Sequence, residues 1–368
     1  MSVPTCRMCL STEEESGEEL ISPCACRGSQ AYVHYGCCLQ YYEARQDWAD
    51  VACPTCGETY DPFVAVLLAL HGEEKCEQQF GVDSVQLAET LVTLGNAYGS
   101  GCDPEKQREI LERAVAIYTS HPPEIAEHPE VGKALIGLGW AHGVLGDADA
   151  QVTLLEKALT IFENALEPES EIPLEMADAY VALADGWRRR NNFERDREYH
   201  QMALDVYEDI YGLVHSRVAS TLVGLARAHG SLGDFSTKLK LLERALHVSL
   251  QVFGEEHPEV AMVRANLART MQKVGGSQPK AIALMRQAYE VLRKQWGEDD
   301  SDVLAMSEAL ADLKQSSSAE QGSGADSTAS TGPPTVGAGL CGRGGSRSCS
   351  SSSRNSRMSE SPASEHTL

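Results

Sequence analysis

The sequence predicts a mostly α-helical protein: a small two-zinc module, then an α-solenoid of helix pairs, then a disordered tail. Three observations predict this fold class. Eight of the twelve cysteines lie between Cys6 and Cys56, Leu, Ala and Glu recur at helical spacing from about residue 63 to 315, and the rest is rich in Ser and Gly without aromatic residues. We therefore divide the chain into a zinc module at 1–62, a connecting or capping helix at 63–81, a repeat array at 82–315 and a disordered tail at 316–368.

The charge and hydropathy of the chain exclude several classes of partner. Its 368 residues include 54 acidic and 31 basic side chains, which give a net charge of −23. This surface repels polyanions, so we expect no nucleic acid partner. No apolar run approaches the roughly 18 residues of a membrane span, and the N-terminus lacks the features of a signal peptide. We expect a cytoplasmic or nuclear protein, in which clustered cysteines bind metal rather than form disulfides.

The N-terminal module carries eight soft or borderline metal ligands in four close pairs. They are Cys6, Cys9, Cys24, Cys26, His34, Cys37, Cys53 and Cys56. Because zinc binds four nitrogen or sulfur ligands tetrahedrally, eight ligands predict two structural Zn²⁺ ions. A segment of this length lacks an adequate core, so metal binding supplies most of its folding free energy, about 10 kcal/mol per site. Cys38 follows Cys37 directly and is the alternative sixth ligand.

Residues around these ligands carry a resemblance to a known family. The stretch from Pro23 to Ser29, the sequence Tyr32-Val33-His34 and the knuckle Cys53-Pro54-x-Cys56 resemble the RING-CH (RING variant) family over residues 1–62. The plant homeodomain finger has the same ligand order, but it usually carries a Trp where this chain has Val51. The resemblance implies interleaved pairing in a cross-brace. One zinc would take Cys6, Cys9, His34 and Cys37, and the other Cys24, Cys26, Cys53 and Cys56.

The same resemblance implies an E3 ubiquitin-protein ligase, which acts by positioning and needs no catalytic residue of its own. RING-type ligases hold a ubiquitin-conjugating enzyme through three residues, which correspond here to Met8, Tyr41 and Pro54. With Cys38 as the sixth ligand, the aromatic residue would be Tyr42. Many active RING ligases place Arg or Lys just after the last ligand, where this chain has Gly57 and Glu58. This departure keeps a second hypothesis open, a non-catalytic zinc-binding adaptor or scaffold.

The central region is an internal repeat with a period of 42 to 45 residues. A leucine followed by a small residue recurs, and an alanine follows about twenty residues later, where two helices must approach closely. The leucines are Leu94, Leu138, Leu183, Leu225 and Leu267; the alanines are Ala114, Ala158, Ala203, Ala245 and Ala288. This pattern resembles tetratricopeptide repeats of the kinesin-light-chain-like kind over about residues 82–296, with capping helices near 63–80 and 302–315.

The repeats also depart from that family's pattern. The usual alanine near the start of the second helix is replaced by Gln107, Gln151, Asp196 and Lys238, and only Ala281 conforms. The resemblance implies a surface that binds a protein or peptide substrate, while the zinc module would bind the ubiquitin-conjugating enzyme. We expect the run Arg188-Arg189-Arg190 to be a solvated helix end.

Overall fold

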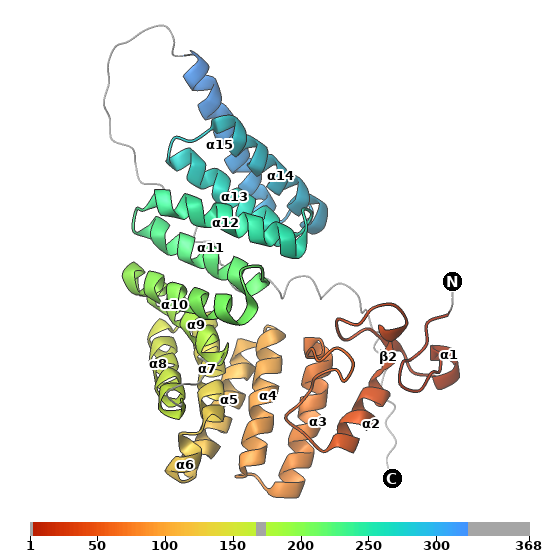
Figure 1. Cartoon of the computed structure of the whole chain (residues 1–368). Coiled ribbons are helices and arrows are strands. Elements are labelled where there is room, and N and C mark those ends of the chain that lie inside the picture. Colours follow the sequence, from red (N-terminus) through yellow and green to blue (C-terminus); the bar gives the residue numbers. More distant parts are fainter. Residues whose placement is uncertain (1–2, 167–173, 323–368) are drawn as a thin grey trace, which may run out of the picture. The chain divides into compact units, whose positions relative to one another are not determined.

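The computed structural model describes residues 3–166 and 174–322 (Figure 1). These residues form two compact units, one that ends at Ala126 and one that begins at Glu127. Helices dominate both units, which confirms the predicted mostly α fold. The last described helix, α15 (Ser301–Gly322), continues beyond residue 315, where we expected the tail to begin. The remainder of the predicted tail lies outside the described residues. Within the described part of the chain, no helix combines the length and apolarity that a membrane crossing requires.

The N-terminal module is built from very short elements. Helix α1 (Glu13–Ser16) begins with a capping box between Thr12 and Glu15. Strands β1 (Leu20–Ile21) and β2 (Val33–His34) pair antiparallel, with Leu20 opposite His34. Between them lies the 3₁₀ turn η1 (Gly28–Gln30), and after them comes α2 (Tyr35–Arg45). With strands of two residues, regular secondary structure alone does not hold this module together.

Four helices complete the first unit: α3 (Pro62–Phe80), α4 (Val85–Ser100), α5 (Pro104–Ser120) and α6 (Pro123–Ala126). Each packs against the next. Helix α3 begins directly after the zinc module, because the carboxylate of Asp61 accepts hydrogen bonds from the amides of Phe63 and Val64. Pro62 at the first helical position suits this start, since its missing N–H needs no partner there.

The zinc module packs against α3 and α4. The Tyr42 hydroxyl donates to the Trp48 carbonyl, and the two rings make an edge contact at 5.3 Å between centroids. Both groups lie against Gly72 of α3, where a β-carbon would collide with the Tyr42 hydroxyl. From α4, the Thr93 hydroxyl donates to the Ala49 carbonyl at 2.6 Å. The module is therefore docked on the first helices of the array.

The second unit consists of stacked helix pairs (Figure 1). Its helices are α7 (Pro129–Leu145), α8 (Ala148–Ala165), α9 (Leu174–Arg189), α10 (Phe193–Tyr211), α11 (Ser216–Ser231), α12 (Phe235–Phe253), α13 (Pro258–Lys273), α14 (Gln278–Trp296) and α15. The repeated leucines and alanines of this unit are buried, as the repeat pattern predicts. His128, His215 and His257 are the N-caps of α7, α11 and α13, and their Nδ1 atoms accept the amide hydrogen of the residue two positions later.

Three of the four polar residues that replace the repeat alanine, Gln107, Gln151 and Lys238, are accommodated by glycines in the facing helix. Gln151 is fully buried, and a β-carbon at Gly143 would lie 2.6 Å from its Cδ atom. Gln107 faces Gly99 in the same way. The Gln151 amide also donates to the Ala182 carbonyl of the next pair at 2.9 Å. Relative to the family pattern, the small residue thus stands in the first helix of the pair and the large residue in the second. At Gln151 the large residue also forms a hydrogen bond to the next repeat.

The end of α9 carries two arginines that turn toward the protein rather than into solvent. The Arg188 and Arg227 guanidinium groups both donate to the same oxygen of Asp185, each at 2.9 Å. Asp185 itself is 6% exposed. Arg189 donates to Gln151 Oε1 on α8. The expected solvated helix end is therefore wrong for Arg188, and one buried carboxylate serves two arginines.

Docking of the zinc module on α3 can be tested at the contact between Gly72 and Tyr42. Gly72→Ala inserts a methyl group against the Tyr42 hydroxyl, so we expect the free energy of unfolding to fall by about 1–3 kcal/mol in chemical denaturation. Tyr42→Phe loses one hydrogen bond, worth about 1 kcal/mol, but makes room for that methyl group. The double variant should therefore lose less than the sum of the single variants. Additive losses would contradict the contact.

Candidate metal centre

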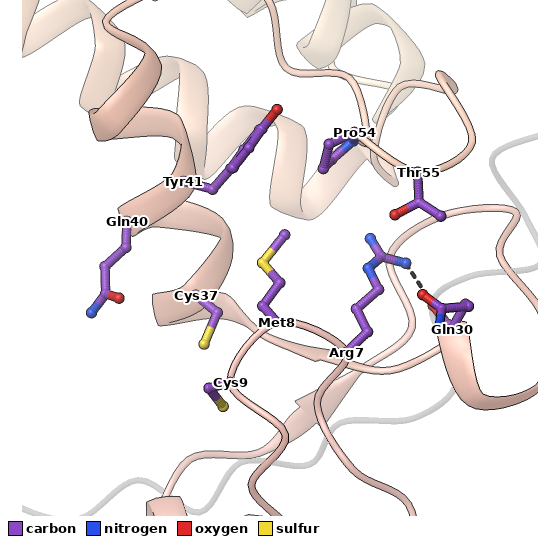
Figure 2. A pocket seen from close by; sticks show the side chains of 9 residues that line it. All are labelled: Arg7, Met8, Cys9, Gln30, Cys37, Gln40, Tyr41, Pro54 and Thr55. Carbon is purple, nitrogen blue, oxygen red and sulfur yellow. Dashed lines mark hydrogen bonds between the residues drawn. The ribbon is translucent and has the colours of Figure 1, made fainter.

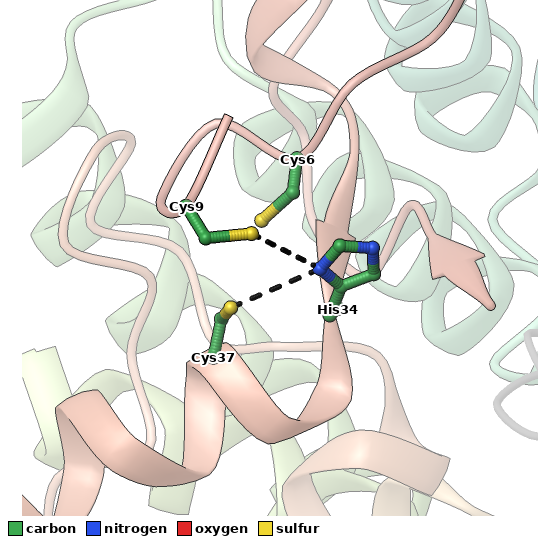
Figure 3. Close-up of side chains that lie close together, drawn as sticks. All are labelled: Cys6, Cys9, His34 and Cys37. Atoms are coloured by element: carbon green, nitrogen blue, oxygen red, sulfur yellow. Dashed lines mark hydrogen bonds between the residues drawn. The ribbon is translucent and has the colours of Figure 1, made fainter. Parts of the chain in front are cut away.

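The first cluster joins three segments of the zinc module (Figure 3). Cys6 and Cys9 precede α1, His34 ends β2 and Cys37 lies in the first turn of α2. Their potential ligand atoms all lie within 4.8 Å of one another. His34 Nδ1 is 3.3 Å from Cys9 Sγ, and His34 Nε2 is 3.0 Å from the Ser16 hydroxyl. Nδ1 therefore faces the thiols and would be the ligand nitrogen for a bound ion, while the contact with Ser16 would hold the ring in that orientation.

The second cluster contains Cys24, Cys26, Cys53 and Cys56, whose sulfur atoms also lie within 4.8 Å of one another. The Thr55 amide donates to Cys53 Sγ at 3.3 Å. Arg7, which comes from the knuckle of the other cluster, approaches Cys24 Sγ at 3.5 Å and Cys53 Sγ at 3.1 Å. A four-cysteine zinc site carries excess negative charge, so this guanidinium offsets part of it.

Arg7 is a residue of the site that the sequence analysis missed. Its guanidinium also donates to the Gln30 carbonyl at 2.6 Å, so it connects the first knuckle, the second cluster and the η1 turn. Burial disfavours its charge, but the hydrogen bond to Cys24 and the charges of Cys53, Cys24 and Cys26 raise the pKa of Arg7 above its ordinary value. The only feature of the local sequence that could have indicated a role for Arg7 is its position between Cys6 and Cys9.

The thiols of the first cluster differ in how readily they ionise. Burial disfavours the Cys6 thiolate, but backbone amides that include Cys9, His34 and Met8 lower the pKa of Cys6 to about 6. Burial, and then hydrogen bonds with Cys9 and Cys6, raise the pKa of Cys37 to about 12. Since metal ions bind thiolates, loading this cluster releases the protons that such thiols hold.

Both donor sets suit zinc. Three thiolates with one imidazole, and four thiolates, are the tetrahedral sets of structural zinc sites. Each cluster supplies four protein ligands, so a zinc ion held there would keep no position for a reactive water. Such ions would supply folding free energy and position the loops around them.

The structure separates the two candidates for the sixth ligand. Cys37 belongs to the first cluster, whereas Cys38 is buried against Tyr60. Burial raises the pKa of Cys38 to about 11, although the hydrogen bond with Tyr60 opposes this shift. Adjacent residues of a helix point about 100° apart, which explains why only one of the two cysteines faces the cluster.

A pocket of about 480 Å³ adjoins the first cluster (Figure 2). It is lined by Arg7, Met8, Cys9, Gln30, Cys37, Gln40, Tyr41, Pro54 and Thr55. The three residues that the sequence analysis assigned to one binding surface, Met8, Tyr41 and Pro54, thus line one pocket. Tyr42, the alternative aromatic residue, is buried against α3 instead.

Comparison with known proteins assigns both regions. The family model of the RING-variant domain matches residues 6–56, and the tetratricopeptide repeat model matches residues 176–217 and 218–259. The chain therefore contains a RING-variant domain and tetratricopeptide repeats, as predicted. E3 ubiquitin-protein ligase MARCHF5 of Xenopus laevis is 37% identical over 60 residues, which are 15% of this chain and 21% of that protein. The match thus spans about a fifth of the relative's length.

Two solved structures resemble the helical repeats. The crystal structure of BtubC (BKLC) from P. vanneervenii is 20% identical, with a TM-score of 0.51 over 75% of this chain and 99% of that chain. The apo form of RapI is 14% identical, with a TM-score of 0.53 over 78% of this chain and 91% of that chain. These likenesses concern the fold of stacked helix pairs.

The ligand assignment can be tested with adjacent cysteines as a matched pair. Cys37→Ser removes a donor from the first cluster, so we expect the purified protein to lose about one of two bound zinc ions. Cys38→Ser changes the neighbouring thiol, which lies outside both clusters, and should keep both ions. Mass-spectrometric metal analysis measures the difference. Equal zinc content in the two variants would contradict the placement of Cys37.

Proposed function

We propose that this protein is an E3 ubiquitin-protein ligase. In this proposal the RING-variant domain recruits a ubiquitin-conjugating enzyme, and the repeat array binds the protein that receives ubiquitin. The observation that carries the proposal is the pocket in which Met8, Tyr41 and Pro54 come together from three separate segments. The RING-variant match and the relative named as a ligase support the same activity.

The pocket has the composition of a small protein-docking site. Met8 lies between two donors of the first cluster, and Pro54 lies between two donors of the second. Tyr41 is 37% exposed on α2, and the Arg45 guanidinium lies 5.8 Å from its ring centre. Apolar and aromatic anchors beside polar groups such as Arg7 and Gln40 are typical of interaction hot spots. Metal binding would hold Met8 and Pro54 in place for the incoming enzyme.

Catalysis in this proposal is positional. Zinc ions with four protein ligands activate no water, so the reactive thioester belongs to the recruited enzyme. Contacts of Tyr42, Trp48 and Ala49 with α3 and α4 join the module firmly to the first helices of the array. A substrate bound to the array would therefore reach the thioester at a raised effective concentration.

The adaptor hypothesis rests on the residues after the last ligand. Gly57 has a φ of 73°, a conformation that favours glycine, and the Glu58 carbonyl accepts the Cys53 amide at 2.8 Å. This tight knuckle presents no basic side chain at Gly57 or Glu58. An adaptor would bind zinc and protein partners without accelerating ubiquitin transfer.

Self-ubiquitination tests the proposed pocket. Purified protein with ubiquitin, activating enzyme and a panel of conjugating enzymes should modify itself. Met8→Ala and Tyr41→Ala should each lower the rate about tenfold or more, because each removes an anchor of the docking site. Both variants should keep two zinc ions. Cys24→Ser, which disrupts the second cluster, should abolish activity.

Phe63→Ala is the matched control, because Phe63 is another exposed apolar residue of the first unit that lies outside the pocket. We expect it to retain the wild-type rate. A zinc-loaded protein that stays inactive with every conjugating enzyme would favour the adaptor. Equal activity of Met8→Ala, Tyr41→Ala and wild type would contradict the proposed surface.

A further inference from the structure

The hydroxyl of Ser16 contacts His34 on the side of the ring that faces away from the first cluster. Figure 3 shows Nδ1 directed at the thiols and the second ring nitrogen, Nε2, on the opposite side of the ring. Nε2 lies 3.0 Å from Ser16 Oγ, and this hydroxyl donates its proton to the Thr12 carbonyl at 2.8 Å. With a metal ion on Nδ1, the Nε2–H group would donate to Ser16 Oγ. The serine oxygen would thus orient a metal ligand.

Ser16 lies in an acidic segment, which we define as residues 13–19. This segment contains five glutamates and no basic residue. Three of the five carboxylates accept backbone amides: Glu13 accepts that of Leu20 at 2.7 Å, Glu15 that of Thr12 at 3.0 Å and Glu18 that of Gly36 at 2.6 Å. The acidic segment therefore holds α1 against the start of β1 and the first turn of α2.

Helix α1 can open at little cost. It has four residues, none of them is buried, and Ser16 at its end is exposed. A segment with so few buried apolar contacts lies at the low end of local stability. An enzyme that needs the Ser16 hydroxyl in an extended segment can therefore reach it without unfolding the helical array.

We propose that Ser16 is a phosphorylation site through which a protein kinase weakens zinc binding at the first cluster. The acidic segment suits a kinase with a basic substrate groove, because carboxylates on both sides of the hydroxyl are attracted to it. Transfer of the γ-phosphoryl group of ATP forms a bond from phosphorus to Ser16 Oγ and breaks the bond from phosphorus to the β–γ bridging oxygen. ADP leaves, and the hydroxyl proton passes to the base of the kinase.

The phosphate would remove the partner of His34. It replaces the proton that Ser16 donates to Thr12, so this hydrogen bond is lost. It also adds about two negative charges among five carboxylates, at the C-terminal end of α1, where negative charge is unfavourable. Repulsion therefore turns the phosphoserine away from the segment. Loss of a group that orients a ligating histidine typically lowers metal affinity about 10- to 100-fold.

The same change would reach the pocket through α2. Glu18, two residues after Ser16, holds the Gly36 amide in the first turn of this helix. Opening of the acidic segment would release that turn, and α2 carries both Cys37 and Tyr41. We therefore expect phosphorylation to slow ubiquitin transfer. This second effect rests on the proposed function, whereas the effect on zinc does not.

The test uses the full-length, zinc-loaded protein, ATP and a kinase that prefers acidic substrates. Peptide mass spectrometry should locate a phosphate on Ser16. In competition with a chromogenic chelator, the phosphorylated protein should hold one of its two zinc ions about tenfold less tightly than the unmodified protein. Ser16→Glu should weaken the same ion, and Ser16→Ala should do so to a smaller extent, because it removes the oxygen without adding charge. Both variants should keep the circular dichroism of the helical array.

Ser11→Glu is the matched control. It makes the same charge change just before α1, where the Ser11 carbonyl, not its side chain, accepts the Cys6 amide at 2.9 Å. This variant should hold both zinc ions within about twofold of wild type. Phosphate on Ser11 or Thr12 but never on Ser16 would overturn the inference. Wild-type zinc affinity in both Ser16→Glu and the phosphorylated protein would overturn it as well.

Self-ubiquitination of the same samples separates this inference from the proposed function. Phosphorylation of Ser16 that weakens zinc binding, in a chain that transfers no ubiquitin in either form, would contradict the ligase and support the site. An active ligase in which Ser16→Glu keeps both its zinc ions and its rate would contradict only the site.

Discussion

The interleaving of two ligand sets is the constraint on which the N-terminal region depends. The first cluster takes its donors from before and after the segment that holds Cys24 and Cys26, which belong to the second cluster. The second cluster likewise takes its donors from before and after the segment that holds His34 and Cys37. Consequently neither cluster can close without bringing the first knuckle, the start of α2 and the last knuckle together. Arg7 adds a direct link, because it leaves the first knuckle and reaches the sulfur of Cys53. With two-residue strands and a small core, these donors fix the geometry of the pocket more than secondary structure does.

The order imposed by the clusters extends into the array through α2. Tyr41 and Tyr42 are neighbours on this helix, and their side chains face different surroundings. Tyr42 is buried against Gly72 of α3, while Tyr41 lines the pocket. A single short helix therefore presents one aromatic residue to a candidate partner and uses the next to anchor the module. The Asp61 amide, which donates to the Pro23 carbonyl at 2.6 Å, ties the start of α3 to the same module.

Much of this arrangement could be predicted from the sequence, because spacing and periodicity encode it locally. The ligand pairs, the buried leucines and alanines, and the histidines at helix starts all have such signals. Other features depend on contacts between residues that are distant in sequence. Two examples are the docking of Trp48 on α3 and the approach of Arg188 and Arg227 to Asp185, and no periodic sequence pattern indicates either contact. Arg7 was missed for the same reason, since its partners lie 17 and 46 residues away.

One position of the repeat shows how a single structural exchange can serve two purposes. Where the facing helix has glycine, at Gly99, Gly143 and Gly230, the usual alanine is replaced by a long polar side chain. The fifth repeat keeps Ala281, and its facing helix has Gln272 at the corresponding place. Glycine thus makes room for a polar group in the helix interface. At Gln151 that group bonds to the next repeat and stabilises the stack, because a buried amide requires partners. At Lys238 the same room admits the aliphatic stem of a half-buried lysine, so the exchange also covers apolar surface between α11 and α12.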